Sequence, residues 1–423
     1  MASDAAMAAN WAGNVRFGAE RVVAPESVEE LQEVVAGTRK ARALGTGHSF
    51  SRIADTDGTL ISTARLPRRI RIDAGGTVTV SGGARYGDLA RELETAGWAL
   101  RNLGSLPHIS IAGACATGTH GSGNGNGNLA TSVAGLELVT ASGELASVRR
   151  GVDPDFEGHV IALGALGVTV AVTLDLVPTF QVRQLVYEGL TQARLLASVD
   201  DIFAAAYSVG VFTGWDPASS QVWLKQRVDE PDGDGEPPAE RFGARLATRP
   251  LHPVPGIDPA HTTRQLGVPG PWHERLPHFR LDFTPSAGDE LQTEYFVARK
   301  HAAAAIEAIF AIGATVRPAL QISEIRTVAA DSLWLSPAYQ RDVMALHFTW
   351  LPDEATVLPA VAAVERQLAP FAPAPHWGKV FSLPPDAVRA GYPCAAQFLA
   401  LAARRDPGAV FRNQYLDTYL PMG

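Results

Sequence analysis

The sequence predicts a protein with both helices and strands and with more than one domain. Its 423 residues are enough for two or three domains, and 46% of them are hydrophobic, as expected of a chain with a sizeable core. Residues 20–180 alternate helix patterns with short β-rich runs. The composition changes after Pro178, and a further alternation of helix and strand patterns occupies residues 289–369.

In the first half of the chain, a helix is expected directly after Ser27, because Ser27 and Glu30 form a capping box ahead of an apolar helical face. A second helix is predicted at residues 86–96 and is ended by Gly97. Short β-rich runs predict the strands of this half at residues 59–62, 70–72, 77–81, 136–141 and 168–177.

The second half begins with residues 180–228, which are predicted to form a strand–helix–strand unit. Residues 229–240 are acidic and rich in Gly and Pro, and therefore predict a loop. Residues 250–271 are rich in Pro and are consistent with a long loop over a site. The last fifty residues contain the motif H-W-G-K at 376–379 and a terminal helix.

The charge and cysteine content exclude several classes of protein. A net charge of -8 without a basic block argues against nucleic acid and anionic lipid as partners. Cys115 and Cys394 are the only cysteines, too few for a disulfide framework or a four-cysteine metal site. The N-terminus has no signal-peptide pattern, and no run reaches the ~20 apolar residues of a membrane span. We expect a cytoplasmic protein that is not membrane-bound.

The stretch A-L-G-T-G-H-S-F-S at residues 43–51 places His48 in a loop of small residues. Successive backbone N–H groups in such a Gly-rich turn can form a nest for an anion such as a pyrophosphate. The alternative is a plain turn with a surface histidine. The sequence at this point leaves both interpretations open.

Residues 103–128 consist almost entirely of small and hydroxyl-bearing side chains. No helix or strand preference explains this composition. A flexible linker is the alternative, but the segment carries several apolar residues that would be costly to expose to water. A buried segment that packs closely against a flat cofactor fits better. Neither G-x-G-x-x-G after a strand nor a P-loop is present, so the common NAD-type fold is not expected.

Residues 320–328, taken as a strand, place Glu324 and Arg326 on one face. The other residues expected on that face are apolar: Leu320, Ile322 and Val328. Buried charges are tolerated when they are paired, so a structural ion pair is one interpretation and a site is the other.

Residues 345–351 repeat the pattern, with His347 and Thr349 on one face and Phe348 and Trp350 on the other. A lone histidine in such a strand is commonly a satisfied core residue. Two strands that each present a polar pair suggest instead one polar wall in an apolar pocket. Four other histidines lack the spacing of metal ligands, and no metal site is expected: His252, His261, His273 and His278.

The motifs A-L-G-T-G-H-S-F, S-L-P-H-I-S-I-A-G and T-G-T-H-G-S-G resemble those of the vanillyl-alcohol-oxidase-type flavoproteins with a PCMH-type FAD-binding fold. Together with E-I-R, H-F-T and H-W-G-K in the same order, they resemble the alditol oxidases most closely. The resemblance implies an α+β fold, with a two-subdomain FAD-binding domain formed by residues 1–178 and 373–423. It implies a substrate domain with a large antiparallel sheet at residues 179–372.

The same resemblance implies that FAD is held covalently through His48, bonded to its 8α-methyl carbon. The resemblance does not determine which of the two imidazole nitrogens forms this bond. The residues that the resemblance places at FAD are Gly45, Thr46, Gly47, His48, Ser49, Phe50, Ser105, Ser110, Gly113, Ala114, Thr117, Gly118, Thr119, His120, Val168 and His376.

The implied reaction is oxidation of the terminal CH–OH of an alditol such as xylitol or sorbitol, with O2 reduced to H2O2. Glu324, Arg326 and Lys379 are the implied catalytic residues, although a loop lysine is by default a solvated surface charge. The implied substrate-binding residues are Ser105, Glu324, Arg326, His347, Thr349 and Lys379. Polyol and O2 are the expected partners of what we expect to be a monomer.

Two rival functions remain. The nearer is a sugar-acid γ-lactone oxidase or dehydrogenase of the same superfamily. The further is a flavin-binding protein without enzymatic activity, which would leave Glu324, Arg326 and Lys379 without a role. The preferred polyol, and the choice between oxidase and dehydrogenase, do not follow from the sequence.

Overall fold

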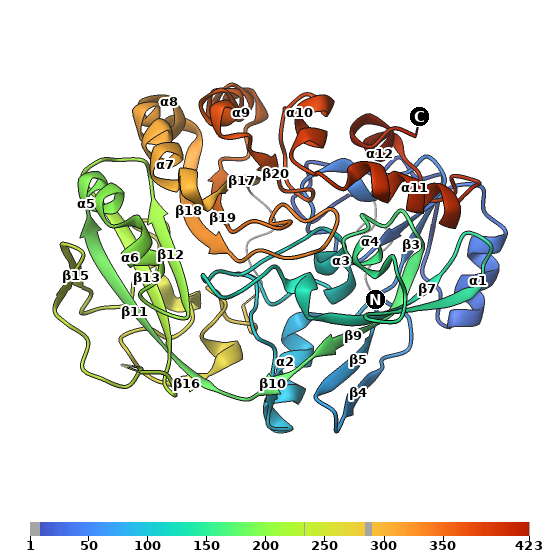
Figure 1. Cartoon of the computed structure of the whole chain (residues 1–423), viewed down its shortest axis with the longest axis horizontal. Coiled ribbons are helices and arrows are strands. Elements are labelled where there is room, and N and C mark those ends of the chain that lie inside the picture. Colours follow the sequence, from blue (N-terminus) through green and yellow to red (C-terminus); the bar gives the residue numbers. More distant parts are fainter. Residues whose placement is uncertain (1–8, 232, 284–289, 423) are drawn as a thin grey trace.

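Four β-sheets organise the part of the chain that the computed structural model describes, residues 9–231, 233–283 and 290–422. Two of these sheets are large, a five-stranded sheet in the first half and a ten-stranded antiparallel sheet in the second (Figure 1). The predicted α+β class with a large antiparallel sheet is confirmed. Residues 1–8, on which part of the N-terminal expectation rested, lie outside the described residues.

The N-terminal sheet has three parallel strands and is covered by helix α1 (Val28–Ala36). The capping box forms at its start, because the Ser27 hydroxyl accepts a hydrogen bond from the Glu30 backbone N–H at 3.0 Å. Leu31 and Val35 are buried in the core beneath the helix. In spatial order the strands are β1 (Arg21–Val23), β3 (Thr59–Ser62) and β2 (Ala41–Leu44). The short 3-10 helix η2 (Arg52–Ala54) lies between β2 and β3 in the chain.

The five-stranded sheet is antiparallel throughout, and its strands are β4 (Ile70–Asp73), β5 (Thr77–Ser81), β9 (Val168–Asp175), β7 (Val133–Val139) and β8 (Leu145–Arg149). Gly97 follows the second predicted helix with a φ of 78°, a left-handed conformation that favours glycine. The other elements of this half are α2 (Tyr86–Thr95), α3 (Ile111–Ala116), η3 (Leu129–Ser132), α4 (Phe156–Val160) and the antiparallel pair β6 (Trp98–Ala99) and β10 (Val177–Pro178).

Helix α3 lies inside the small-residue segment 103–128, although the composition of that segment does not favour a helix. Tertiary packing overrides local propensity here, because Ile111, Ala114 and Cys115 are buried in the core. The segment is therefore a packed part of the fold, which excludes the linker interpretation.

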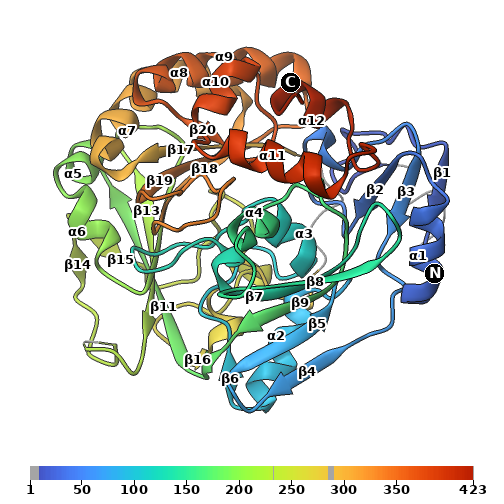
Figure 2. The same ribbon diagram turned by 45° about the vertical axis from the view of Figure 1, so that its right-hand side comes forward.

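The ten-stranded sheet spans the second half of the chain (Figures 1 and 2). Residues 180–228 contribute one strand more than predicted, because two strands follow the helical part. In spatial order the strands are β14 (Glu240–Arg241), β15 (Ala244–Leu246), β11 (Gln181–Leu190), β13 (Ser220–Arg227), β12 (Ser208–Thr213), β18 (Leu320–Val328), β19 (Val343–Trp350), β17 (Leu291–Ala298) and β20 (Ala374–Pro375), while β16 (Gly270–Pro271) pairs with β11.

Helices cover one face of this sheet and share a core with alternate residues of its strands, among them Phe348 and Trp350 of β19. The neighbours of these two residues in sequence, His347 and Thr349, lie on the opposite face, as predicted. The covering helices are α5 (Gln192–Ala197), α6 (Val199–Phe203), α7 (Ala302–Ala311), α8 (Gly313–Val316) and α9 (Glu354–Leu368). Short 3-10 helices connect other parts of this half: η4 (Pro259–His261), η5 (Trp272–Glu274), η6 (Arg299–His301), η7 (Arg317–Ala319) and η8 (Ala369–Phe371).

Within the described residues, no single helix is long and apolar enough to cross a membrane, and one bent pair, Arg299–Ala311 with Gly313–Ala319, passes that test only by length and composition.

The C-terminal helices return to the first half of the chain (Figure 2). Phe398 of α11 and Leu416 of α12 share one buried core with Leu89 and Phe156. These last helices are α10 (Pro385–Ala390), α11 (Ala395–Arg405) and α12 (Gln414–Tyr419). The division into domains at residues 178 and 373 stays a prediction.

Candidate active site

A cavity of about 590 Å³ brings together segments that are far apart in the sequence. Its walls are the loop 43–51, the small-residue segment 103–120, strands β17 to β19 and the motif at 376–379. Residues of the Pro-rich loop, among them His252 and His261, also line it. The cavity is where the two halves of the fold meet.

His48 lies in the cavity wall, with its ring stacked on Trp11 at a centroid distance of 5.3 Å. Burial, and then the charge of Lys379, lower the pKa of His48 to about 4, so its imidazole is neutral at pH 7. Among the described residues, none forms a hydrogen bond with its buried Nδ1. A neutral ring with a free nitrogen is available as a nucleophile.

The small-residue segment closes tightly on the loop that carries His48. The Thr46 hydroxyl accepts a hydrogen bond from the Ser110 backbone N–H at 3.0 Å. A Cβ atom on Gly45 would lie 2.3 Å from the Ser110 hydroxyl oxygen, so a side chain at this position would force the Ser110 side chain to move. Both segments therefore present backbone to the cavity at close range, as a cradle for a flat or anionic group requires.

Of the residues predicted at the cofactor, Gly118 and Val168 do not line the cavity, although residues next to each of them do. The predicted residues that do line it are Gly45, Thr46, Gly47, His48, Ser49, Phe50, Ser105, Ser110, Gly113, Ala114, Thr117, Thr119, His120 and His376.

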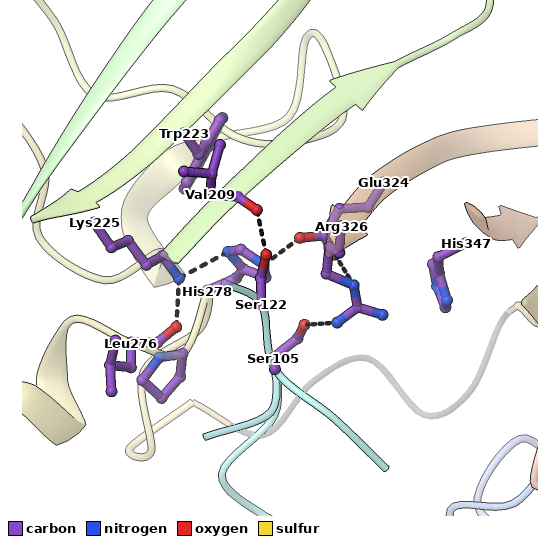
Figure 3. Close-up of polar contacts among 12 residues, drawn as sticks. Ser105, Ser122, Val209, Trp223, Lys225, Leu276, His278, Glu324, Arg326 and His347 are labelled. Atoms are coloured by element: carbon purple, nitrogen blue, oxygen red, sulfur yellow. Dashed lines mark hydrogen bonds and ion pairs between the residues drawn. The ribbon is translucent and has the colours of Figure 1, made fainter. Parts of the chain in front are cut away.

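Glu324 and Arg326 project from β18 into the cavity, and both are almost completely buried (Figure 3). Burial acts to raise the pKa of Glu324, but the charge of Arg326 and the hydrogen bond with His278 bring it down to about 2. Arg326 Nε lies 3.5 Å from the Glu324 carboxylate, and its Nη1 donates a long 3.5 Å hydrogen bond to the Ser105 hydroxyl. The predicted shared face of Glu324 and Arg326 is confirmed.

Leu320 does not share that face. The pairing of β18 with β19 shifts by one residue between Leu320 and Ile322, at a β-bulge. Leu320 therefore packs with the core beneath the helices, while Ile322 packs in a separate apolar cluster that includes Phe212. Strict alternation was the wrong assumption at this end of the strand.

His347, Thr349 and Lys379 complete the polar wall. His347 Nε2 lies 3.2 Å from the Thr349 hydroxyl oxygen, and burial lowers the pKa of this histidine. Lys379 donates a hydrogen bond to the Gln292 side-chain carbonyl oxygen. Burial lowers the pKa of Lys379 to about 8, and Glu294 is the first group that opposes this shift.

Glu294 of β17 is a central acid of the site that the sequence reasoning missed. Its carboxylate accepts a hydrogen bond of 2.5 Å from Arg326 and lies 3.1 Å from His120 Nε2 and 3.6 Å from His347 Nδ1. Burial acts to raise the pKa of Glu294, but these three neighbours hold it well below its usual value. The period-2 series Glu290, Gln292, Glu294 could have revealed it.

Lys225 and His278 were also missed. His278 stands in a loop without a motif, and Lys225 is one of several polar residues in strand β13, so no local signal marks either of them. In the described part of the chain, no group of three or more His, Cys, Asp or Glu side chains could hold a metal ion.

Comparison with known proteins extends this picture. The family model "FAD binding domain" matches residues 19–149, and the model "D-arabinono-1,4-lactone oxidase" matches residues 289–419. The alditol oxidase of Streptomyces sp. (strain IKD472 / FERM P-14339) is 49% identical over 412 residues, which cover 96% of this chain and 97% of that protein. This chain belongs to the alditol oxidase family.

More distant relatives of this family member include the L-gulono-1,4-lactone dehydrogenase of Mycobacterium tuberculosis (strain ATCC 25618 / H37Rv), 31% identical over 96% of this chain and 97% of that protein. The crystal structure of cholesterol oxidase from B. sterolicum has a TM-score of 0.75 at 17% identity and covers 98% of this chain and 96% of that one. That similarity shows the fold.

The residues present in this alditol oxidase family member fit FAD. The cavity holds a neutral histidine whose Nδ1 is unpaired among the described residues, and a glycine-rich loop in which a Cβ on Gly45 would crowd the Ser110 hydroxyl. The polar wall of β18 and β19 lies in the same cavity. An FAD-dependent oxidoreductase that acts on CH–OH groups needs a flavin and a hydroxyl-binding surface in one enclosed space, and this cavity provides residues suited to both.

Proposed function

We propose that the protein oxidises the terminal CH–OH of an alditol such as xylitol or sorbitol to the aldehyde. The observation that carries this proposal is the single cavity in which the His48 loop faces a wall of hydroxyl-binding side chains. When bound, FAD would supply the two-electron acceptor that this oxidation needs, and O2 would take up those electrons to form H2O2.

Arg326 and Lys379 stabilise the negative charge that develops on the substrate oxygen as its proton leaves. His347 accepts that proton, because burial keeps its imidazole neutral and Glu294, 3.6 Å from Nδ1, stabilises the resulting cation. Glu324 is a poor base with a pKa of about 2. Its role is to accept hydrogen bonds from other substrate hydroxyls.

Ser105 and Thr349 supply further hydroxyl contacts along the wall. A site built to pair hydroxyls rejects analogues that lack them, because its own buried groups would be left without partners. A row of such groups suits a polyol, which presents one hydroxyl on each carbon.

We also propose that His48 bonds covalently to the 8α-methyl carbon of FAD. The new C–N bond replaces one C–H bond of the methyl group and one proton of the imidazole, and the two electrons left on the flavin pass to O2 to give H2O2. The unpaired Nδ1 and the neutral ring of His48 support this assignment.

A sugar-acid γ-lactone is the alternative substrate class. It is supported by the match of residues 289–419 to a D-arabinono-1,4-lactone oxidase model and by the 31% identical lactone dehydrogenase. The 49% identity to an alditol oxidase favours the polyol. A monomeric state and a cytoplasmic location stay predictions, which sedimentation and fractionation would test.

The test is an anaerobic titration of the purified yellow protein with xylitol and, separately, with L-gulono-1,4-lactone. We expect xylitol to bleach the flavin absorbance, and air to restore it with formation of about one H2O2 per flavin. The variant Glu324→Leu serves as the comparison and should bleach far more slowly. Bleaching by the lactone and not by xylitol would contradict the polyol assignment and support a sugar-acid γ-lactone as the substrate.

A further inference from the structure

A line of buried polar groups runs from Glu324 through His278, which also lines the cavity, to Lys225, which does not (Figure 3). His278 Nε2 lies 2.9 Å from the Glu324 carboxylate, and His278 Nδ1 lies 3.2 Å from Lys225 Nζ. Lys225 also donates a hydrogen bond to the Leu276 carbonyl oxygen. The roles in the preceding section do not use Lys225 or His278.

The Glu324 carboxylate, at one end of this line, determines which groups donate and which accept the hydrogen bonds. That carboxylate has only acceptors to offer, so His278 Nε2 must carry the proton and donate it. The ring is neutral, because burial, and then the charge of Lys225, lower the pKa of His278 to about 4. Nδ1 is therefore an acceptor, and the Lys225 amine is its donor.

The position of the His278 ring is also constrained from both sides. The rings of Phe212 and Trp223 meet it edge-on at centroid distances of 5.1 and 5.7 Å. Its backbone N–H donates a hydrogen bond of 3.2 Å to the Ser105 carbonyl oxygen. One residue thus contacts two parts of the polar wall, the Glu324 carboxylate and the Ser105 segment.

A buried lysine at this place is costly. Lys225 is 2% exposed, and burial lowers its pKa to about 7 although Glu324 opposes the shift. An apolar residue of similar volume would avoid the loss of hydration. Stability alone therefore gives little reason for an amine here, whereas control of the His278 tautomer gives a direct one.

We propose that Lys225 and His278 are positioning residues that aim the Glu324 carboxylate at the substrate. Lys225 fixes the tautomer of His278, and His278 holds one carboxylate oxygen by donating from Nε2. The second oxygen stays on the side of Arg326, whose Nε is 3.5 Å away. The inference rests on the proposed polyol oxidation and assigns two further residues to it.

The experiment compares Lys225→Met, His278→Leu, His278→Gln and the Lys225→Met/His278→Leu double variant with the unchanged enzyme. Glutamine can place an amide donor where histidine has Nε2, whereas leucine cannot. The matched control is His159→Leu, because His159 is equally buried, bonds to a backbone carbonyl and does not line the cavity. Flavin content, melting temperature and anaerobic reduction by xylitol are measured for each.

We expect His278→Leu to weaken xylitol binding about tenfold or more per bound flavin, since a hydrogen bond to a buried carboxylate is lost. His278→Gln should stay within about threefold of the unchanged enzyme, by the same reasoning. The double variant should bind xylitol as weakly as His278→Leu does, because Lys225 acts on Glu324 only through His278. His159→Leu should change the melting temperature only.

Normal xylitol binding in His278→Leu, equal losses in the leucine and glutamine variants, or additive losses in the double variant would each overturn the inference. A failure of the proposed function is distinguishable from these results. If xylitol does not reduce the unchanged enzyme, the polyol assignment fails, and the positioning role fails with it.

Discussion

Glu294→Gln is the change that most directly tests the charge arrangement of the site. Glu294 is 2% exposed and accepts a 2.5 Å hydrogen bond from Arg326, which is itself 6% exposed. Glutamine keeps the shape and removes the charge, so Glu324, 3.5 Å from Arg326 Nε, is the one anionic partner that Arg326 retains among the described residues. Removing one partner of a buried ion pair costs ~3–5 kcal/mol of the free energy of unfolding.

The shift in melting temperature follows from chain length. The entropy of unfolding is ~2.1 cal/mol/K per residue, so 423 residues give about 0.9 kcal/mol/K. The loss of ~3–5 kcal/mol therefore lowers the melting temperature by about 3–6 °C. Thermal unfolding of the flavin-loaded protein, followed by circular dichroism, measures this shift.

The same change should alter the pH dependence of flavin reduction. Lys379 has a pKa of about 8, and Glu294 is the first group that raises it against the effect of burial. Without that negative charge the pKa falls further. Because Lys379 is cationic below its pKa and neutral above it, the decline in the reduction rate should begin at a lower pH in Glu294→Gln.

Glu365→Gln is the matched control. Glu365 is 6% exposed and accepts hydrogen bonds from the Tyr295 hydroxyl and from the Ser382 backbone N–H and hydroxyl, all neutral donors. We expect a smaller loss, about 1–2 kcal/mol, and an unchanged pH profile. The reasoning is refuted if Glu294→Gln melts no lower than Glu365→Gln and keeps the pH profile of the unchanged enzyme.

Three further predictions concern the flavin and the lysine. His48→Ala should leave FAD bound but separable on denaturing gels; yellow colour that still migrates with the denatured chain would exclude His48 as the attachment site. Lys379→Met should slow flavin reduction by about 100-fold or more, and the fall in rate as pH rises through about 8 should disappear, since no amine is left to lose its proton. Gly45→Ala should lower FAD content, because the added Cβ would lie 2.3 Å from the Ser110 hydroxyl; Gly75→Ala, where nothing lies within 4 Å, should retain it.

The sequence alone determined the features that depend on neighbouring residues. The capping box predicted helix α1, Gly97 predicted the end of the second helix, and alternation predicted the shared faces of Glu324 with Arg326 and of His347 with Thr349. Each of these rests on the geometry of one turn or one strand. The motifs also led to the correct family, since the chain is 49% identical to an alditol oxidase.

The tertiary structure decided what depends on distant partners. The β-bulge beside Ile322 moved Leu320 to the other face, and packing made a helix of residues 111–116. The partners of Glu324 and Arg326 come from elsewhere in the chain, with Glu294 on β17 and Lys225 on β13. Burial and the charges that surround a buried group set pKa values, and both arise only when separate segments meet. The chemical type of each site residue could therefore be predicted from the sequence. Its ionisation state and the orientation of its side chain depend on the fold.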